Sequence, residues 1–205
     1  MKQPIGLILA GGQATRMGGG DKSRNDLGGR SILSHVIERL EPQVSQIVLN
    51  ANGDAGRFDD TGFSVVPDSI DGFAGPLAGV LAGLDWAAAH GASHVVSVAA
   101  DTPFFPCDLV PQLILAAEAQ DKPIALAASP DPVKGMMRHP TFGLWPVNLR
   151  EDLRAALLGG LRKVVLWTDT HGTAQAAFPA PVFDPFFNVN TPHDLETARG
   201  LMEDL

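Results

Sequence analysis

A glycine-rich segment with two cationic side chains is the first part of the sequence whose residues could do chemistry. The segment LAGGQATRMGGGDKS, residues 9–23, follows the apolar run IGLILA and includes Arg16 and Lys22. Glycines let the main chain take positive φ values and let its N–H groups approach an anion closely. Ligands of open α/β sheets bind beyond the carboxyl ends of the strands. The pattern therefore predicts a phosphate-binding loop.

Two well-known phosphate motifs do not match this segment. The P-loop requires Gly-Lys-Ser/Thr, but here Asp21 precedes Lys22 and Ser23. The dinucleotide fingerprint also fails, because Ser23 stands where its third glycine should be, and this disfavours a nicotinamide-dependent oxidoreductase. Two alternatives stay open at this point: a flexible surface loop for the segment and a surface salt bridge for Arg16.

One carboxylate stands where a metal ion would be useful. Asp101 directly follows the apolar run HVVSVAA, so we expect it at the carboxyl end of a strand near the first one. Mg²⁺ prefers hard oxygen ligands and is commonly held by one or two carboxylates together with substrate phosphates. The alternative for Asp101 is a helix cap before Thr102. A second carboxylate is not assigned, and Asp21 could serve to brace Lys22.

The elements that must position these residues alternate between strands and helices. Apolar runs predict strands at 5–10, 46–50, 63–66 and 94–100, and helical spacing predicts helices at 31–40, 75–90 and 108–119. Later segments predict strands in IALAAS and TFGLWPV, a short FNVN strand, and helices at 149–158, 161–167 and from Thr191 onward. This order predicts a single α/β domain over residues 1–205, a Rossmann-like three-layer αβα arrangement with a mainly parallel central sheet.

Composition narrows the functional classes. The chain has 205 residues, with 15 Lys+Arg against 23 Asp+Glu and a formal net charge of -8, which argues against a broad nucleic-acid surface. Cys107 is the only cysteine, so no disulfide within the chain is expected. No apolar run approaches the roughly 18 residues of a membrane span. We therefore expect a cytoplasmic protein without nucleic-acid or membrane partners.

Several short segments occur in the order typical of one enzyme family. They are LAGGxxxRMGxxDK, VLNAN (48–52), PDS (67–69), GPLAG (75–79), ADTP (100–103), HPT (139–141) and FNVNTP (187–192). The loop resembles that of nucleotidyltransferases, and its double glycine is similar to that of the molybdenum cofactor guanylyltransferases. Ala100 and Arg30 depart from the family pattern, and nothing in 129–138 matches it.

The resemblance implies transfer of GMP from GTP to the terminal phosphate of molybdopterin, with a nucleotide-binding part at roughly 1–105 and an acceptor-binding part at roughly 106–205. It implies that Lys22 contacts the phosphates, that Asn50 and Asp68 contact guanosine, and that Asp101 binds Mg²⁺. The residues that would line the nucleotide are Leu9, Ala10, Gly11 and Gly12, and those expected near the acceptor or metal are Asn188 and Asn190. An alternative for Asp68 is to cap the following turn.

The chemistry of this transfer explains the expected residue types. A phosphate monoester has a second pKa of about 6, so the attacking oxygen is already ionised and needs no general base. The main obstacle is repulsion between anions, which cations, a metal ion and backbone donors reduce. We therefore expect Arg16, Lys22 and Asp101 to be catalytic, with Arg16 neutralising the pyrophosphate that leaves.

Rival interpretations concern the nucleotide, the acceptor and catalysis itself. They are a molybdopterin cytidylyltransferase that uses CTP, an enzyme with a sugar phosphate acceptor, and a non-catalytic carrier of the finished cofactor. Molybdenum insertion proteins and molybdoenzyme chaperones are expected as transient partners. His35, His90 and His94 lack metal-ligand spacing, whereas His139 could shape the acceptor side.

Overall fold

The structure is a computed structural model that describes residues 2–11, 21–70, 72, 75–133, 135–180 and 182–203. Its strands are β1 (Ile5–Leu9), β2 (Asp26–Leu27), β3 (Arg30–Ser31), β4 (Ile47–Asn50), β5 (Ser64–Val66), β6 (His94–Ala99), β7 (Ile124–Asp131), β8 (Gly135–Pro146) and β9 (Thr173–Ala177). Its α-helices are α1 (Ile32–Leu40), α2 (Pro76–Ala89), α3 (Leu109–Ala119), α4 (Arg150–Leu158), α5 (Val164–His171) and α6 (Pro192–Glu203). Short 3₁₀ helices are η1 (Lys22–Arg24), η2 (Glu41–Gln43), η3 (Ala55–Thr61) and η4 (Val147–Leu149).

A central sheet organises the chain. Within the described residues it has seven strands in the order β5-β4-β1-β6-β8-β7-β9. Strands β5, β4, β1 and β6 are parallel, β8 runs antiparallel to both β6 and β7, and β9 is parallel to β7. The expected mainly parallel sheet is confirmed. Because the chain proceeds from β1 to β4 on one side and later returns to β6 on the other, the carboxyl end of β1 is a topological switch point.

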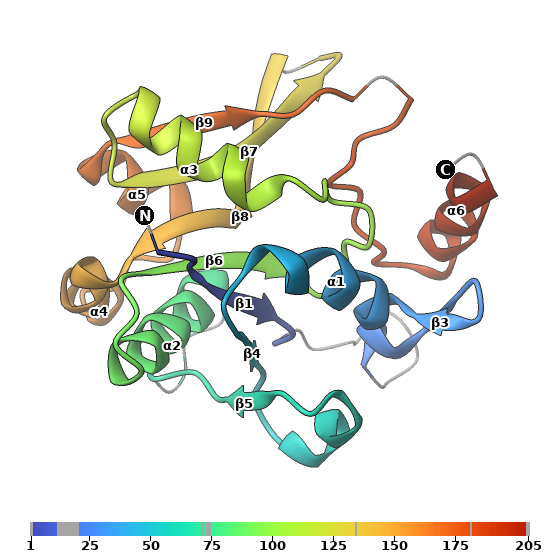
Figure 1. The fold of residues 1–205 in the computed structure, drawn as a ribbon, viewed down its shortest axis with the longest axis horizontal. Coiled ribbons are helices and arrows are strands. Elements are labelled where there is room, and N and C mark those ends of the chain that lie inside the picture. The colour runs from blue at the N-terminus through green and yellow to red at the C-terminus, as the bar shows by residue number, and fades with distance from the viewer. Residues whose placement is uncertain are drawn as a thin grey trace.

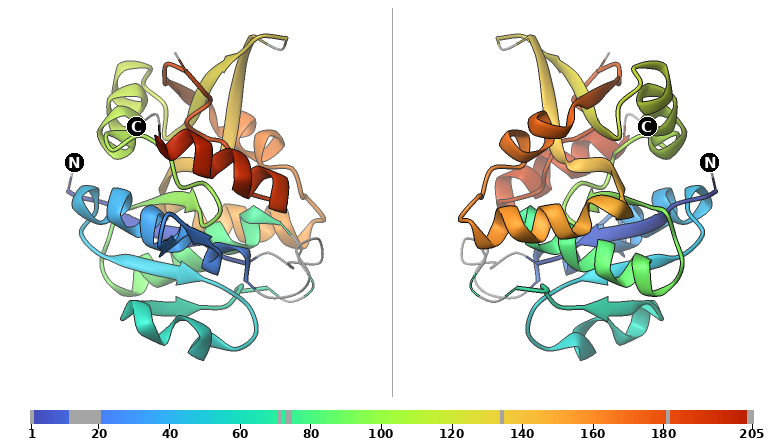
Figure 2. Two further views of the ribbon diagram at one scale, coloured as in Figure 1. Left: turned by 90° about the vertical axis from the view of Figure 1, so that its right-hand side faces the viewer. Right: turned by 90° about the vertical axis from the view of Figure 1, so that its left-hand side faces the viewer.

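Helices cover both faces of the sheet, so the expected three-layer arrangement is also confirmed. Helices α1 and α3 pack on one face, where Ile8, Leu49 and Val98 face them. Helices α2, α4 and α5 pack on the other, against Leu7 and Trp145. Both panels of Figure 2 show these two groups on opposite sides of the strands. The full burial of β1 on both faces explains why its sequence, IGLIL, has no polar alternation.

The C-terminal helix α6 lies apart from these layers, beside the small β2–β3 hairpin (Figure 1). A separate apolar cluster joins the two: Leu27 and Ile32 pack with Val189 and Ala198. Thr191 caps the start of α6, because its hydroxyl accepts from the Asp194 amide at 3.1 Å. This packing fixes the chain just before α6 near the N-terminal part of the molecule.

Some elements differ from the sequence-based expectations. The FNVN segment forms no strand, because its amides are used in turn and loop contacts rather than in a ladder. Helix α5 begins at Val164, three residues later than expected. The β2–β3 hairpin and β9 were not predicted, since two-residue strands and the small residues of TAQAA carry little hydrophobic pattern. Among the helices of the described chain, none is long and apolar enough to cross a membrane.

Candidate active site

The carboxyl ends of four neighbouring strands form the floor of the site. The ladder of β1 continues past the strand, because the Ala10 amide donates to the Asn50 carbonyl at 2.9 Å and the Ala100 amide donates to the Leu9 carbonyl at 3.1 Å. The Ala51 amide donates likewise to the Val66 carbonyl at 3.0 Å. The residues that follow β1, β4, β5 and β6 are therefore held side by side at one edge of the sheet.

Asparagine amides orient the carboxylate that follows β5. Asn50 Nδ2 donates to Asp68 Oδ1 at 3.0 Å, and Asn52 Nδ2 donates to Asp68 Oδ2 at 2.8 Å. The Asp68 amide donates back to Asn52 Oδ1 at 2.9 Å. Asp68 thus bonds across to the loop that follows β4. Each carboxylate oxygen still has acceptor capacity, so Asp68 could accept from a bound base.

Asn52 was not predicted as a site residue, although it belongs to the VLNAN segment. The signal was the second asparagine two positions after the first, which places both side chains on the side of the chain that faces Asp68. Asn50 itself is 3% exposed. We conclude that Asn50 and Asn52 set the orientation of Asp68, which has more access to solvent than Asn50 does.

Gly79 allows close approach around Asn50, whereas Gly11 is not needed for it. A Cβ at Gly79, in the GPLAG segment at the start of α2, would lie 2.3 Å from Asn50 Oδ1 and 2.7 Å from Leu9 Cδ2. A Cβ at Gly11 would lie 3.5 Å from the same oxygen, which is an ordinary contact. Gly79 is therefore required for packing of α2 against the ends of β1 and β4.

A second group of polar side chains gathers on the other side of β1. Lys22 Nζ donates to Asn190 Oδ1 at 3.2 Å across 168 positions of sequence. The Thr102 hydroxyl donates to Asn188 Oδ1 at 2.6 Å and lies 3.3 Å from Asp101 Oδ1. The structure thus brings together the two sequence-predicted residues Lys22 and Asp101 and the late asparagines.

The backbone reinforces this group. The Val189 amide donates to the Asp101 carbonyl at 2.8 Å, so the FNVN segment is tied directly to the residue after β6. Thr102, which is fully buried, was not predicted as a site residue. Its signal was its place in ADTP, between the expected metal ligand and a proline.

Asp101 is in an unusual environment for a carboxylate. Burial raises the pKa of Asp101, and the Thr102 hydroxyl and the charge of Lys22 only partly oppose this increase. The next helix, α3, begins at Leu109, so the alternative of a helix cap for Asp101 is wrong. A poorly solvated carboxylate is stabilised when a cation binds to it, whereas the charge of Lys22 already compensates part of this cost.

The 3₁₀ helix η1 holds Lys22 in place. Asp21 Oδ1 accepts from the Ser23 amide at 3.1 Å and from its hydroxyl at 2.7 Å. Asp21 Oδ2 is 3.6 Å from Arg57 Nε of η3. Asp21 therefore anchors η1 to the rest of the protein, in agreement with the role of a brace.

Not every predicted residue can be placed. Gly12 and Arg16 lie outside the described residues. Of the rest, Leu9 and Ala10 end the first strand beside Asn50, and Gly11 follows them. Among the residues that the structure describes, no cluster of three or more His, Cys, Asp or Glu side chains could hold a metal ion.

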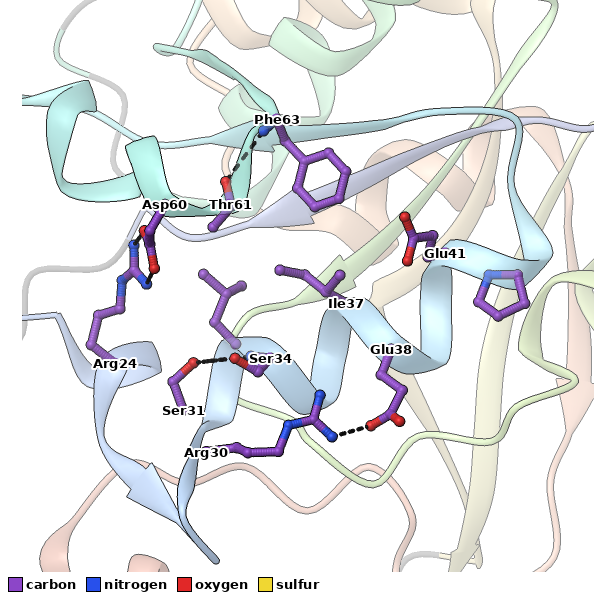
Figure 3. A pocket seen from close by; sticks show the side chains of 12 residues that line it. Arg24, Arg30, Ser31, Ser34, Ile37, Glu38, Glu41, Asp60, Thr61 and Phe63 are labelled. Carbon is purple, nitrogen blue, oxygen red and sulfur yellow. Dashed lines mark hydrogen bonds and ion pairs between the residues drawn. The ribbon is translucent and has the colours of Figure 1, made fainter.

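A separate cavity of about 570 Å³ lies between α1 and the η3–β5 segment (Figure 3). Lys22, Asn50, Asp68 and Asp101 do not line it. Its cations are paired: Arg24 Nη1 donates to Asp60 Oδ2 at 2.7 Å, and Arg30 Nη1 donates to Glu38 Oε2 at 2.7 Å. Arg30, which stands where the family commonly has lysine, is thus in a surface ion pair.

Comparison with known proteins agrees with the geometry. The family model described as MobA-like NTP transferase domain matches residues 6–172. A solved structure of molybdopterin-guanine dinucleotide biosynthesis protein A from Archaeoglobus fulgidus has a TM-score of 0.73, with 22% identity over 98% of this chain and 100% of that one. The fold and the strand-end site define the class of the protein: it is an α/β nucleotidyltransferase.

Relatives with closer sequences narrow the class to one family. A molybdenum cofactor guanylyltransferase from Bradyrhizobium sp. (strain ORS 278) is 54% identical over 97% of this chain and 94% of its own. Another, from Rhodopseudomonas palustris (strain HaA2), is 51% identical over 97% of this chain and 92% of its own. The chain belongs to the molybdenum cofactor guanylyltransferase family.

Proposed function

We propose that the protein transfers GMP from GTP to the terminal phosphate of molybdopterin and releases pyrophosphate. This proposal rests on the positions of Lys22 and Asp101 near the carboxyl end of β1. Lys22 is bound by Asn190, and Thr102, next to Asp101, is bound by Asn188. Such an arrangement offers positive charge and a metal ligand where phosphates must lie, and it offers no activated nucleophile. Family membership at 54% identity supports the same reaction.

The transfer would proceed by direct displacement. A phosphate oxygen of molybdopterin forms a bond to the α-phosphorus of GTP while the bond from that phosphorus to the bridging oxygen of the β-phosphate breaks. The electron pair of the broken bond leaves with pyrophosphate. In this step Lys22 would neutralise charge on the nucleotide phosphates, and Asp68, held by Asn50 and Asn52, would accept from the donor groups of guanine.

We propose Mg²⁺ as the cofactor, with Asp101 as its protein ligand. A carboxylate and nearby amide oxygens are hard donors of the kind that Mg²⁺ prefers, and the raised pKa of Asp101 is consistent with a site that gains stability when a cation binds. When bound, the ion would reduce repulsion between the nucleotide phosphates and the attacking phosphate. Asn188 and Asn190 would hold Thr102 and Lys22 at fixed positions around it.

The two parts of the chain would then bind different substrates. Residues up to about 105 supply the contacts with the nucleotide, and residues beyond supply the acceptor side through Asn188 and Asn190. A cytoplasmic location, and transient contacts with molybdenum insertion proteins and molybdoenzyme chaperones, fit this role because the product must pass to other proteins. Co-purification of the protein with molybdenum insertion proteins would test those contacts.

The deciding experiment measures pyrophosphate release with Mg²⁺ and molybdopterin, in parallel with GTP, CTP, ATP and UTP. Release with GTP alone is expected. Release with CTP instead would favour a cytidylyltransferase and would remove the assignment of Asp68 to guanine. Absence of release with every nucleotide would contradict the enzymatic function and favour a cofactor carrier. Omission of Mg²⁺ from the GTP reaction tests the metal, because release without any divalent ion would contradict its role.

A further inference from the structure

A cluster of three polar side chains lies outside the strand-end site and joins three distant parts of the chain. Ser129, near the end of β7, is fully buried, and His139 of β8 is 8% exposed. Ser129 Oγ lies 2.7 Å from His139 Nε2 and 3.0 Å from Asp184 Oδ1. Asp184 belongs to the segment that leads from β9 toward α6.

The positions of the hydrogens in this cluster follow from counting donors. A serine hydroxyl has one hydrogen, and an ionised carboxylate can only accept. Ser129 therefore donates to Asp184, and His139 Nε2 must carry a hydrogen that it donates to Ser129. Burial lowers the pKa of His139, while the charge of Asp184 opposes this. The imidazole presents no lone pair to the serine, so the cluster is not arranged to activate Ser129 as a nucleophile.

The same carboxylate shapes the chain that follows it. Asp184 Oδ1 also accepts from the Phe186 amide at 3.0 Å, and the Asp184 carbonyl accepts from the Phe187 amide at 3.0 Å. The Phe186 ring stacks on the His139 ring with centroids 4.2 Å apart. The His139 ring thus packs directly on the turn 184–187, and its hydrogen bond reaches the same turn through Ser129.

This turn leads directly to the residues that contact Thr102, Asp101 and Lys22. Asn188 accepts from Thr102, the Val189 amide donates to the Asp101 carbonyl, and Asn190 accepts from Lys22. Since the FNVN segment forms no strand, no sheet ladder holds it. Its path from β9 is set by the turn before it and by α6 after it.

We propose that Ser129, His139 and Asp184 are positioning residues, which hold Asn188 and Asn190 against Asp101 and Lys22 and so align the acceptor side of the site. This inference deepens the proposed function and rests on it for the role of the asparagines. The proposal assigns one structural role to the HPT segment and to the end of β7, which matches no segment of the family. The three residues act through the segment 186–190 and do not need to touch a substrate.

The first test uses amide hydrogen exchange, which does not depend on catalysis. In Asp184→Ala, protection of the Val189 amide should fall by at least about 10-fold, while amides of β1 stay as protected as in the unaltered protein. The matched control is Asp152→Ala, which removes a carboxylate that accepts from Trp167 and His171 elsewhere in the protein. Unchanged protection of Val189 in Asp184→Ala would overturn the proposal, whatever the activity of the protein.

The second test uses steady-state pyrophosphate release with GTP and molybdopterin. In Ser129→Ala and His139→Leu, kcat/KM for molybdopterin should fall by about 10- to 100-fold, as for other supporting residues of active sites, while KM for GTP changes little. His139→Gln retains an N–H near the position of Nε2 and should recover most of the loss. Equal effects on both substrates, or no recovery with glutamine, would indicate a structural role alone and contradict the inference. Failure of the unaltered protein to release pyrophosphate would count against the proposed function only, because the exchange experiment still decides the positioning role.

Discussion

Replacement of Gly79 by alanine should weaken GTP binding beyond what the loss of stability alone would cause. The new Cβ would lie 2.3 Å from Asn50 Oδ1 and 2.7 Å from Leu9 Cδ2, well inside contact distance. Asn50 is 3% exposed and cannot turn away into solvent, so its amide group must shift. That shift removes the bond from Asn50 Nδ2 to Asp68 Oδ1, which is 3.0 Å long in the structure.

The size of the effect follows from the bond that is lost. A hydrogen bond to a charged group contributes about 1.5–3 kcal/mol, and every 1.4 kcal/mol is about tenfold in affinity. If orientation of Asp68 is needed to bind guanine, the dissociation constant for GTP should rise by about 10- to 100-fold. Overpacking should cost about 1–3 kcal/mol of unfolding free energy. Higher helix propensity of alanine should restore about 1 kcal/mol.

The same helix provides a matched control in Gly83. A Cβ there would lie 2.5 Å from Leu7 Cδ2, so Gly83→Ala crowds the core to a similar degree but touches only an apolar side chain. GTP affinity by calorimetry and unfolding free energy by urea titration should be measured for both variants. Similar losses of stability are expected, with weakened GTP binding in Gly79→Ala alone. Equal weakening in both variants, or in neither, would refute the link from Gly79 through Asn50 to Asp68.

Four further substitutions test the remaining roles. Lys22→Ala should keep the fold by circular dichroism but lose pyrophosphate release by roughly 10³-fold, and activity within tenfold of normal would contradict its phosphate role. Because burial raises the pKa of Asp101, its ionised form destabilises the fold above the unfolded pKa. Asp101→Asn should therefore unfold at a higher temperature than the unaltered protein at neutral pH without divalent ions, and a lower temperature would refute this. Asp68→Ala should reduce the preference for GTP over other nucleotides more than it reduces turnover; an unchanged preference would place base recognition elsewhere. Burial alone would raise the pKa of Asp194, but bonds from the Asn190 amide and from Thr191 lower it below its usual value. The ionised Asp194 carboxylate therefore stabilises the fold above the unfolded pKa. This stabilisation is lost as pH falls through the folded pKa. Asp194→Ala should accordingly cost about 1 kcal/mol in urea unfolding at neutral pH and less in acid, and a constant difference would be inconsistent with this cap.

The sequence predicted the parallel core well because buried strands and amphipathic helices have strong hydrophobic patterns. IGLIL, IVLN and HVVSVA are mostly apolar on both faces, and their order with the helices between them led to the correct layers. Strand β9 could not be found in this way, because TAQAA contains no large apolar residue and takes its place through pairing with β7. Strand β8 runs antiparallel because it follows β7 in a hairpin, in which Asp131 pairs with Gly135.

The sequence indicated which residues gather at the strand ends, but it did not indicate the contacts that support them. Lys22, Asp101 and the late asparagines were expected near one another, and the structure brings them together. The support from Ser129 was not expected, because serine in a strand has no distinctive pattern and its partners are 10 and 55 positions away. Long-range hydrogen bonds between common polar residues leave no local signal.

The Lys22–Asn190 contact has a consequence for the timing of synthesis on the ribosome. Its two residues are 168 positions apart, so Lys22 leaves the exit tunnel long before its partner has been translated. At about 5–20 residues per second, the delay is roughly 10–30 s. Before that interval ends, β1, β4, β5 and β6 have all been translated and are available to pair, while the asparagines that join Lys22 and Thr102 are still missing. The nascent chain thus acquires its nucleotide-facing strand ends first and completes the transfer site only after Asn190 has emerged.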